Sequence, residues 1–67
     1  MEVVMVNGKA HPHEADMTIA SLLAAVHGGS GQVVVEVNGD IVPRERYEAT
    51  PLNGGDTVEI VHFVGGG

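Results

Sequence analysis

The residues of this chain that could do chemistry stand at its C-terminal end, where Val64 is followed by three glycines. A glycine run contributes poorly to a fold, because glycine loses more backbone entropy on ordering than any other residue. Without β-carbons, however, Val64, Gly65 and Gly66 could thread a narrow slot in another protein and present the Gly67 carboxylate to reactive atoms there. Five extended residues span at most about 17 Å, a reach that suits an active site buried in a partner.

Composition argues against several other classes of function. The 67 residues allow one domain with a small core. There is no cysteine, which excludes disulfides, thiolate metal sites and cysteine nucleophiles. A net charge of −6 argues against nucleic-acid binding, and no apolar run approaches the roughly 20 residues that span a membrane. We therefore expect a cytoplasmic protein, monomeric when free, whose partners are proteins with basic surfaces.

The first half of the sequence predicts a hairpin followed by a helix. Residues 2–6 and 9–14 are expected to be strands joined by an Asn-Gly turn, and Pro12 indicates that the second strand lies at a sheet edge. Thr18 is the expected N-cap of the helix. Apolar residues then recur at i, i+3, i+4 and i+7, which is one face of a helix. The residues expected to pack that face into the core are Ile19, Leu22, Leu23 and Val26.

The second half predicts further strands at 32–37, 41–42 and 57–63, with a short crossing segment at 44–50 that is either irregular or one helical turn. A long crossover through the helix lets the first and last strands lie parallel at the centre of the sheet. We therefore predict an α+β fold of the β-grasp type, a mixed sheet of four to five strands packed on one main helix. The domain would span residues 1–63, and residues 64–67 would form a flexible tail.

Strand alternation predicts that one face of this sheet lacks a helical cover. Three of the five residues expected there are apolar, and the other two are Glu36 and Glu59. An uncovered apolar cluster rimmed by acids is typical of a docking surface rather than of a solitary monomer. The partner-docking surface that we predict consists of Met5, Val34, Val61 and Phe63.

Other chemical readings of the sequence are weaker. His11 and His13 are two residues apart and share a strand face, but no carboxylate clearly converges on them, so we predict no metal site. The glycine run at 28–31 lacks the Gly-Lys-Ser/Thr ending of a phosphate-binding loop. None of the acids stands in a recognisable pocket motif. We therefore expect no enzyme site and no bound cofactor.

Three segments, residues 18–23, 37–44 and above all 55–67, resemble the ThiS family of ubiquitin-like sulfur carriers in thiamine biosynthesis. The resemblance covers essentially the whole chain. It implies that a ThiF-like adenylyltransferase, using ATP and Mg²⁺, adenylates the Gly67 carboxylate. A cysteine desulfurase or another donor would then supply sulfur to form a thiocarboxylate. A ThiG-like thiazole synthase would take that sulfur to build the thiazole ring.

Three alternatives remain open. The small subunit of molybdopterin synthase uses the same thiocarboxylate, but its tail usually follows a Pro-Pro-Val type segment that residues 62–64 lack. A ubiquitin-like modifier would join Gly67 to lysines of target proteins, although Lys9 is the only lysine available here for self-conjugation. A structural β-grasp module would use no tail chemistry at all.

Overall fold

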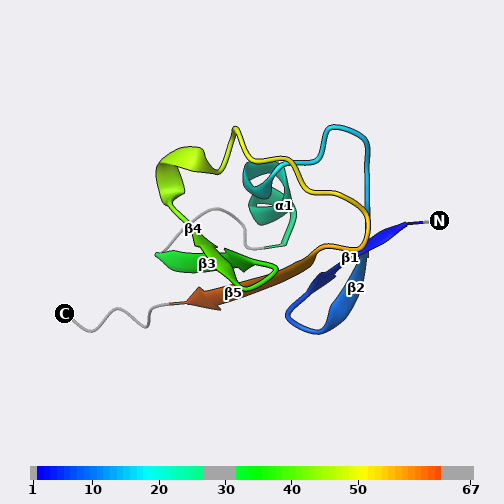
Figure 1. The fold of residues 1–67 in the computed structure, drawn as a ribbon, viewed down its shortest axis with the longest axis horizontal. Coiled ribbons are helices and arrows are strands. Elements are labelled where there is room, and N and C mark those ends of the chain that lie inside the picture. Colours follow the sequence, from blue (N-terminus) through cyan, green and yellow to red (C-terminus); the bar gives the residue numbers. More distant parts are fainter. Residues whose placement is uncertain (1, 27–31, 63–67) are drawn as a thin grey trace.

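A computed structural model describes residues 2–26 and 32–62 of the chain; residue 1 and residues 27–31 and 63–67 lie outside this description. Figure 1 shows the arrangement of the elements. In chain order they are β1 (Val3–Val6), β2 (Lys9–Pro12), α1 (Ile19–Val26), β3 (Val33–Val37), β4 (Asp40–Val42), the short 3-10 helix η1 (Arg44–Arg46) and β5 (Thr57–His62).

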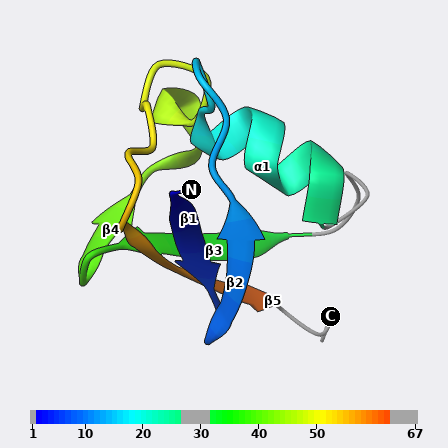
Figure 2. The ribbon, with the colours of Figure 1, turned by 90° about the vertical axis from the view of Figure 1, so that its right-hand side faces the viewer.

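The five strands form one mixed sheet in the order β2-β1-β5-β3-β4. The first and last strands, β1 and β5, run parallel, and the other neighbouring pairs are antiparallel. Helix α1 lies across one face of the sheet, and the described residues leave the other face open (Figure 2). The predicted ubiquitin-like β-grasp fold, with β5 at the centre and Pro12 on an edge strand, is confirmed.

Two Asn-Gly turns close the two hairpins of the sheet. Asn7 and Gly8 adopt φ values of 49° and 84° between β1 and β2, and Asn38 and Gly39 adopt 52° and 90° between β3 and β4. A tight two-residue hairpin of this kind needs positive φ at both central positions, which asparagine and glycine tolerate best. The predicted first hairpin and the second hairpin thus meet the same local backbone requirement.

The N-terminus of α1 is capped as predicted. The backbone N–H of Ser21 donates to Thr18 Oγ1 at 3.2 Å, and the backbone N–H of Thr18 donates to Ser21 Oγ at 3.0 Å. These bonds satisfy amides that the first helical turn leaves without partners. Because an isolated helix of eight residues would be marginal in water, tertiary packing must supply the rest of its stability.

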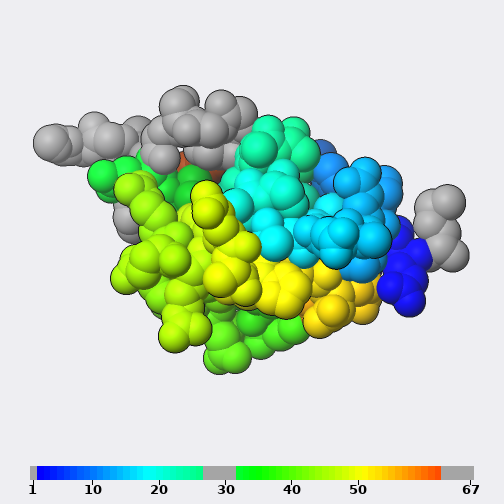
Figure 3. Space-filling model, turned by 90° about the horizontal axis from the view of Figure 1, so that it is seen from above, coloured from blue at the N-terminus to red at the C-terminus, as the bar shows by residue number. Residues whose placement is uncertain are grey.

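The crossing segment after β4 packs along the start of α1 (Figure 3). Backbone N–H groups of Ile19 and Ala20 donate to the carbonyls of Thr50 and Tyr47, both at 3.1 Å. The N–H of Leu52 in turn donates to the carbonyl of Met17 at 2.9 Å. These hydrogen bonds join the segment after β4 to the start of α1 and to the loop that precedes it.

The core lies between α1, the crossing segment and the covered face of the sheet. Its buried members are Val4, Val6, Met17, Ile19, Leu22, Val35, Leu52, Val58 and Ile60. One expectation is wrong: Val26 is exposed, with 37% of its surface accessible. It stands in the last turn of α1, where it lines a cavity together with Val6 and Ile60 of the sheet. Leu52, which the helical and strand patterns did not indicate, is buried instead.

Candidate functional site

The open face of the sheet carries the described part of the predicted docking surface. Buried and less buried residues alternate along β1 and β5, which places Met5 and Val61 opposite the core. Val34 of β3 pairs directly with Val61, so their side chains are neighbours on this face. Val61 is 50% exposed, whereas Met5 and Val34 are partly buried. Phe63, the fourth predicted member, lies outside the described residues.

Two carboxylates stand directly beside this apolar pair. Glu36 of β3 and Glu59 of β5 are cross-strand partners one step along the same face. Like charges at directly opposite positions destabilise a sheet, so the pair opposes folding of the free chain. Ile41 of β4 pairs with Glu36 on the other side and is 67% exposed. The alternation had predicted the two acids on this face, but not the exposed Ile41.

The tail follows the central strand, because β5 ends at His62 in the structure. The predicted site residues Val64, Gly65, Gly66 and Gly67 come directly after it in the sequence and lie outside the described residues. Their roles, and the division into a domain and a tail, therefore remain predictions. What the structure does establish is that the strand leading to them is hydrogen-bonded in the middle of the sheet.

Both Asn-Gly turns reach across to β5 with their side chains. Asn7 Nδ2 donates to the carbonyl of Ile60 at 3.1 Å, and the N–H of Ile60 donates to Asn7 Oδ1 at 2.7 Å. At the other end of β5, the N–H of Thr57 donates to Asn38 Oδ1 at 3.0 Å. Asn38 Nδ2 also donates to Asp56 Oδ1 at 3.1 Å. The asparagines of the two Asn-Gly turns therefore also form hydrogen bonds with β5, the strand that precedes the tail. These hydrogen bonds were not predicted from the sequence.

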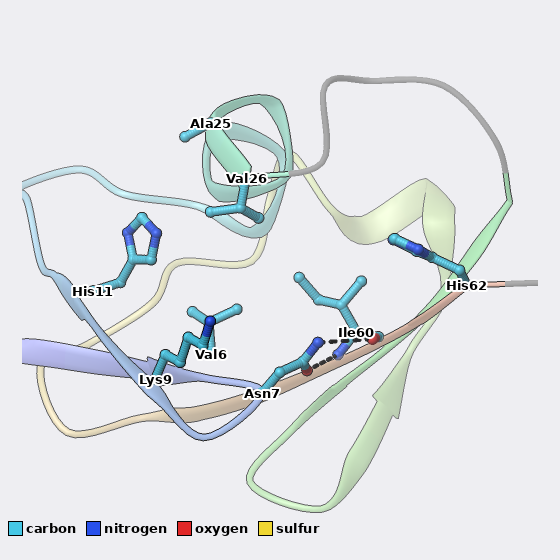
Figure 4. A pocket seen from close by; sticks show the side chains of 8 residues that line it. All are labelled: Val6, Asn7, Lys9, His11, Ala25, Val26, Ile60 and His62. Carbon is cyan, nitrogen blue, oxygen red and sulfur yellow. Dashed lines mark hydrogen bonds between the residues drawn. The ribbon is translucent and has the colours of Figure 1, made fainter.

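A cavity of about 450 Å³ opens between the first hairpin, the end of α1 and β5 (Figure 4). Its lining includes three basic or ionisable nitrogen side chains and none of the chain's nine acids. The lining residues are Val6, Asn7, Lys9, His11, Ala25, Val26, Ile60 and His62. The described lining of this cavity is therefore free of acidic side chains, on a chain whose net charge is −6.

His11 and His13, which the sequence analysis placed on one strand face, do not point to a common site. His11 lies in β2 opposite Val4 and lines the cavity. His13 lies beyond β2, where its Nε2 donates to the carbonyl of Leu52 at 2.7 Å and its Nδ1 stands 4.0 Å from Glu2 Oε1. Among residues 2–26 and 32–62 there is no group of three side chains suited to hold a metal ion. Nor does that part of the chain contain a helix long and apolar enough to cross a membrane.

Comparison with known proteins decides the family. The ThiS family model matches residues 3–67, which include the whole described fold and the glycine tail. The chain belongs to the ThiS family. The resemblance predicted from three segments is therefore confirmed over nearly the full length of the sequence.

Individual relatives of the ThiS-family chain agree with this assignment. It is 42% identical over 66 residues to the sulfur carrier protein ThiS of Bacillus subtilis, covering 97% of this chain and 100% of that protein. The crystal structure of a thiamine biosynthesis protein (ThiS) from Geobacter metallireducens superposes with a TM-score of 0.78. That protein is 35% identical, and the match covers 97% of this chain and 99% of that one.

Two other relatives are much longer than this chain. It is 41% identical over 64 residues to a thiazole synthase of Paramagnetospirillum magneticum and 39% identical over 64 residues to one of Magnetococcus marinus. Each match covers 96% of this chain, but the chain spans only about a fifth of the length of these proteins, 20% in both cases. A segment like this one is therefore part of a larger polypeptide in each of those proteins.

The relatives that the ThiS-family chain matches along nearly their whole length are named a sulfur carrier protein and a thiamine biosynthesis protein. The molybdopterin-type carrier, the protein modifier and the purely structural module are not favoured by any of these matches.

Proposed function

We propose that the chain carries sulfur as a thiocarboxylate on Gly67. The observation that carries the proposal is the match to the Bacillus subtilis sulfur carrier protein ThiS, which covers all of that protein and 97% of this chain. A glycine end that follows a hydrogen-bonded central strand supports it further. The strand gives the tail a fixed origin, and the missing β-carbons let it enter a narrow active site.

The proposed chemistry begins with activation of the carboxylate. An oxygen of the Gly67 carboxylate attacks the α-phosphate of ATP on a ThiF-like adenylyltransferase, and pyrophosphate leaves. The terminal sulfur of a persulfide made by a cysteine desulfurase, directly or relayed, then attacks the acyl carbon and displaces AMP. A thiol of the donor or partner protein cleaves the resulting acyl disulfide, which releases the thiocarboxylate and leaves a disulfide on that protein. Adenylation is needed because the carboxylate itself would have to expel oxide. The partner enzyme supplies the nucleotide site, Mg²⁺ and the charge stabilisation, and we place the reaction in the cytoplasm.

We propose that the partner enzymes dock on the open face of the sheet. The described part of this surface consists of Met5, Val34 and Val61, and Phe63 is its proposed fourth member. Exposed Ile41 and the paired carboxylates of Glu36 and Glu59 lie beside it. An apolar patch with an acidic border favours a partner that offers apolar side chains together with Arg or Lys.

A thiazole synthase is the partner we propose as the sulfur acceptor. Two proteins named thiazole synthase contain a segment about 40% identical to this chain, at 41% and 39%. Joining a carrier to its acceptor in one polypeptide raises their effective concentration, which is useful only when the two act together. The same partnership between separate chains would need the docking surface described above.

The absence of cysteine makes the decisive experiment simple. The protein is incubated with ATP, Mg²⁺, the adenylyltransferase and a sulfur donor, then treated with a thiol-alkylating reagent. We expect one ATP-dependent adduct, located at Gly67 by mass spectrometry of the C-terminal peptide. Peptide mapping matters because replacing oxygen by sulfur adds nearly the same mass as oxidising a methionine. No adduct with a folded carrier and an active partner would contradict the proposal, and isopeptide-linked products would indicate a modifier.

Two tail variants test the threading step. Gly66→Ala and Gly67→Ala should leave the fold intact, because they lie beyond the last strand, yet impair adenylation, because a methyl group must enter the slot. Thermal unfolding measures the first expectation, and the alkylated C-terminal peptide measures the second. Thiocarboxylate formation at the normal rate in either variant would contradict a threaded tail.

A further inference from the structure

We propose that Asn7 is a positioning residue for the carrier reaction. Its side-chain amide holds Ile60 two residues before the end of β5, and thereby sets the direction in which the tail leaves the sheet. The inference rests on the proposed function, because it concerns how the Gly67 carboxylate reaches the adenylyltransferase. Asn7 lies in the first hairpin, far from the tail in the sequence. It belongs neither to the predicted tail nor to the predicted docking surface.

The geometry begins where β1 ends. The parallel pairing of β1 with β5 joins Met5 to Thr57 and Val6 to Val58. The backbone N–H of Asn7 then donates to the carbonyl of Val58 at 2.9 Å, after which the chain turns away.

Beyond that point, the side chain of Asn7 forms the hydrogen bonds to β5 (Figure 4). It accepts a hydrogen bond from the N–H of Ile60 at 2.7 Å and donates one to the carbonyl of the same residue at 3.1 Å. One donor and one acceptor are what a strand residue would offer there. The amide therefore extends the parallel ladder by one step beyond the end of β1.

This additional pair of hydrogen bonds lies near the end of β5, just before the tail begins in the sequence. Beyond Ile60, β5 continues only to His62, and residues 63–67 follow in the sequence. On the β3 side, pairing extends as far as Val33 with His62. On the β1 side, Asn7 supplies the contact at Ile60. A glycine tail cannot fix its own direction, and small displacements of a reacting group lower reaction rates steeply.

Asn38 provides a matched control within the same molecule. It occupies the equivalent place in the second Asn-Gly turn, with φ of 52° against 49° for Asn7. It also accepts a hydrogen bond from β5, but from Thr57 at 3.0 Å, at the beginning of the strand. Loss of this hydrogen bond should loosen the beginning of β5, which is the end of the strand remote from the tail.

The experiment compares the full-length variants Asn7→Gly and Asn38→Gly, since glycine removes the amide and still tolerates positive φ. Thiocarboxylate formation is followed at saturating ATP and sulfur donor while the carrier concentration is varied. We expect Asn7→Gly to lower kcat about tenfold and to change KM by less than about twofold, because docking is untouched. We expect Asn38→Gly to change neither. Amide hydrogen exchange should rise at Ile60 in the first variant and at Thr57 in the second.

Several results would overturn the inference. Equal kcat for the two variants at equal folded fractions would show that the clamp is merely structural, and a change in KM alone would assign Asn7 to docking. If Asn7→Gly does not fold, Asn7→Asp keeps the acceptor for the Ile60 N–H and loses the donor, so a wild-type kcat in that variant would also contradict positioning. A wild-type carrier that forms no adduct would overturn the proposed function, and this inference with it.

Discussion

The two faces of the one sheet use similar residues for different ends. On the covered face, Val4, Val35 and Val58 are fully buried under α1 and the crossing segment. On the open face, Val61 and Ile41 stand 50% and 67% exposed on strands of the same sheet. The alternation of a strand makes both faces available, and a single helix covers only one. The difference teaches that one face of this small domain stabilises the fold, whereas the other keeps apolar side chains exposed and available for the proposed docking.

Charge separates the faces as clearly as exposure does. Among the described residues no charged or polar residue is buried in the core. The open face, by contrast, carries Glu36 directly opposite Glu59. A like-charge pair of this kind weakens the free sheet. The arrangement makes sense if a cationic group of a partner offsets the repulsion in the complex.

The largest effect should come from the covered face. Leu22 is 1% exposed, so Leu22→Ala should lower the free energy of unfolding by about 2–5 kcal/mol through lost burial and a cavity. A domain of this size has a total stability of only about 3–10 kcal/mol, so much of the variant should be unfolded. Urea denaturation measures the loss, and Ala24→Ser on the exposed side of α1 is the control. Near-wild-type stability of Leu22→Ala would contradict the separation of roles.

The next largest effect should come from the open face and appear only in binding. Val61→Lys replaces an apolar contact with a cation facing a basic partner, while nearby Glu59 tolerates the new charge. We expect its affinity for the adenylyltransferase to fall by about 2 kcal/mol, or about thirtyfold, with little loss of stability. Titration calorimetry measures the affinity, and Val61→Thr, similar in shape and uncharged, is the control. Unchanged binding would remove Val61 from the docking surface.

A smaller effect is expected at the helix cap. Thr18→Ala removes the oxygen that accepts the Ser21 N–H at 3.2 Å and should cost about 1 kcal/mol of stability. Because the cap lies on the covered side, partner affinity should not change. Thermal unfolding and calorimetry together check this, and Thr18→Ser should restore the stability. A loss of affinity in a fully folded Thr18→Ala variant would mean that the partner contacts both faces.

The smallest effect has the opposite sign. Glu59→Gln removes the repulsion with Glu36 and should raise the free energy of unfolding by about 0.5 kcal/mol while weakening partner binding. The gain should shrink in high salt, which screens exposed charges. Urea denaturation at two salt concentrations measures it, with Glu45→Gln on η1 as the control. A destabilised Glu59→Gln variant would show that the carboxylate serves the fold.

Much of the fold followed from local signals in the sequence. The Asn-Gly turns, the Thr18 cap and the apolar period of the helix each state a backbone requirement that few residues meet. Together with the apolar alternation of the strands, these signals predicted five strands and one helix. Val26 fits the helical period and is nevertheless exposed, because the period gives the direction of a side chain and not whether another element lies opposite it. Leu52 was missed for the converse reason, since no period marks a buried loop residue.

The candidate site divides along the same line. The alternation of the open face could be predicted, because it depends on residue type and spacing alone, whereas the role of the glycine tail stays a prediction. The cavity beside Lys9 and His11 could not, since it forms only where the hairpin, the end of α1 and β5 meet. The second task of Asn7 was equally hidden, because its partner Ile60 lies 53 residues away in the chain.

The sequence by itself determined the turns, the helix, the apolar alternation and the glycine tail, because each depends on the backbone preferences of a few neighbouring residues. Only the tertiary structure decided which valines are buried, that Glu36 faces Glu59, and that an asparagine of the first turn holds the last strand. These are contacts between distant segments, and their geometry is set by the strand order and register of the assembled sheet. Local backbone preferences decide which segments become strands, turns or helix, and tertiary packing decides which of these segments contact one another.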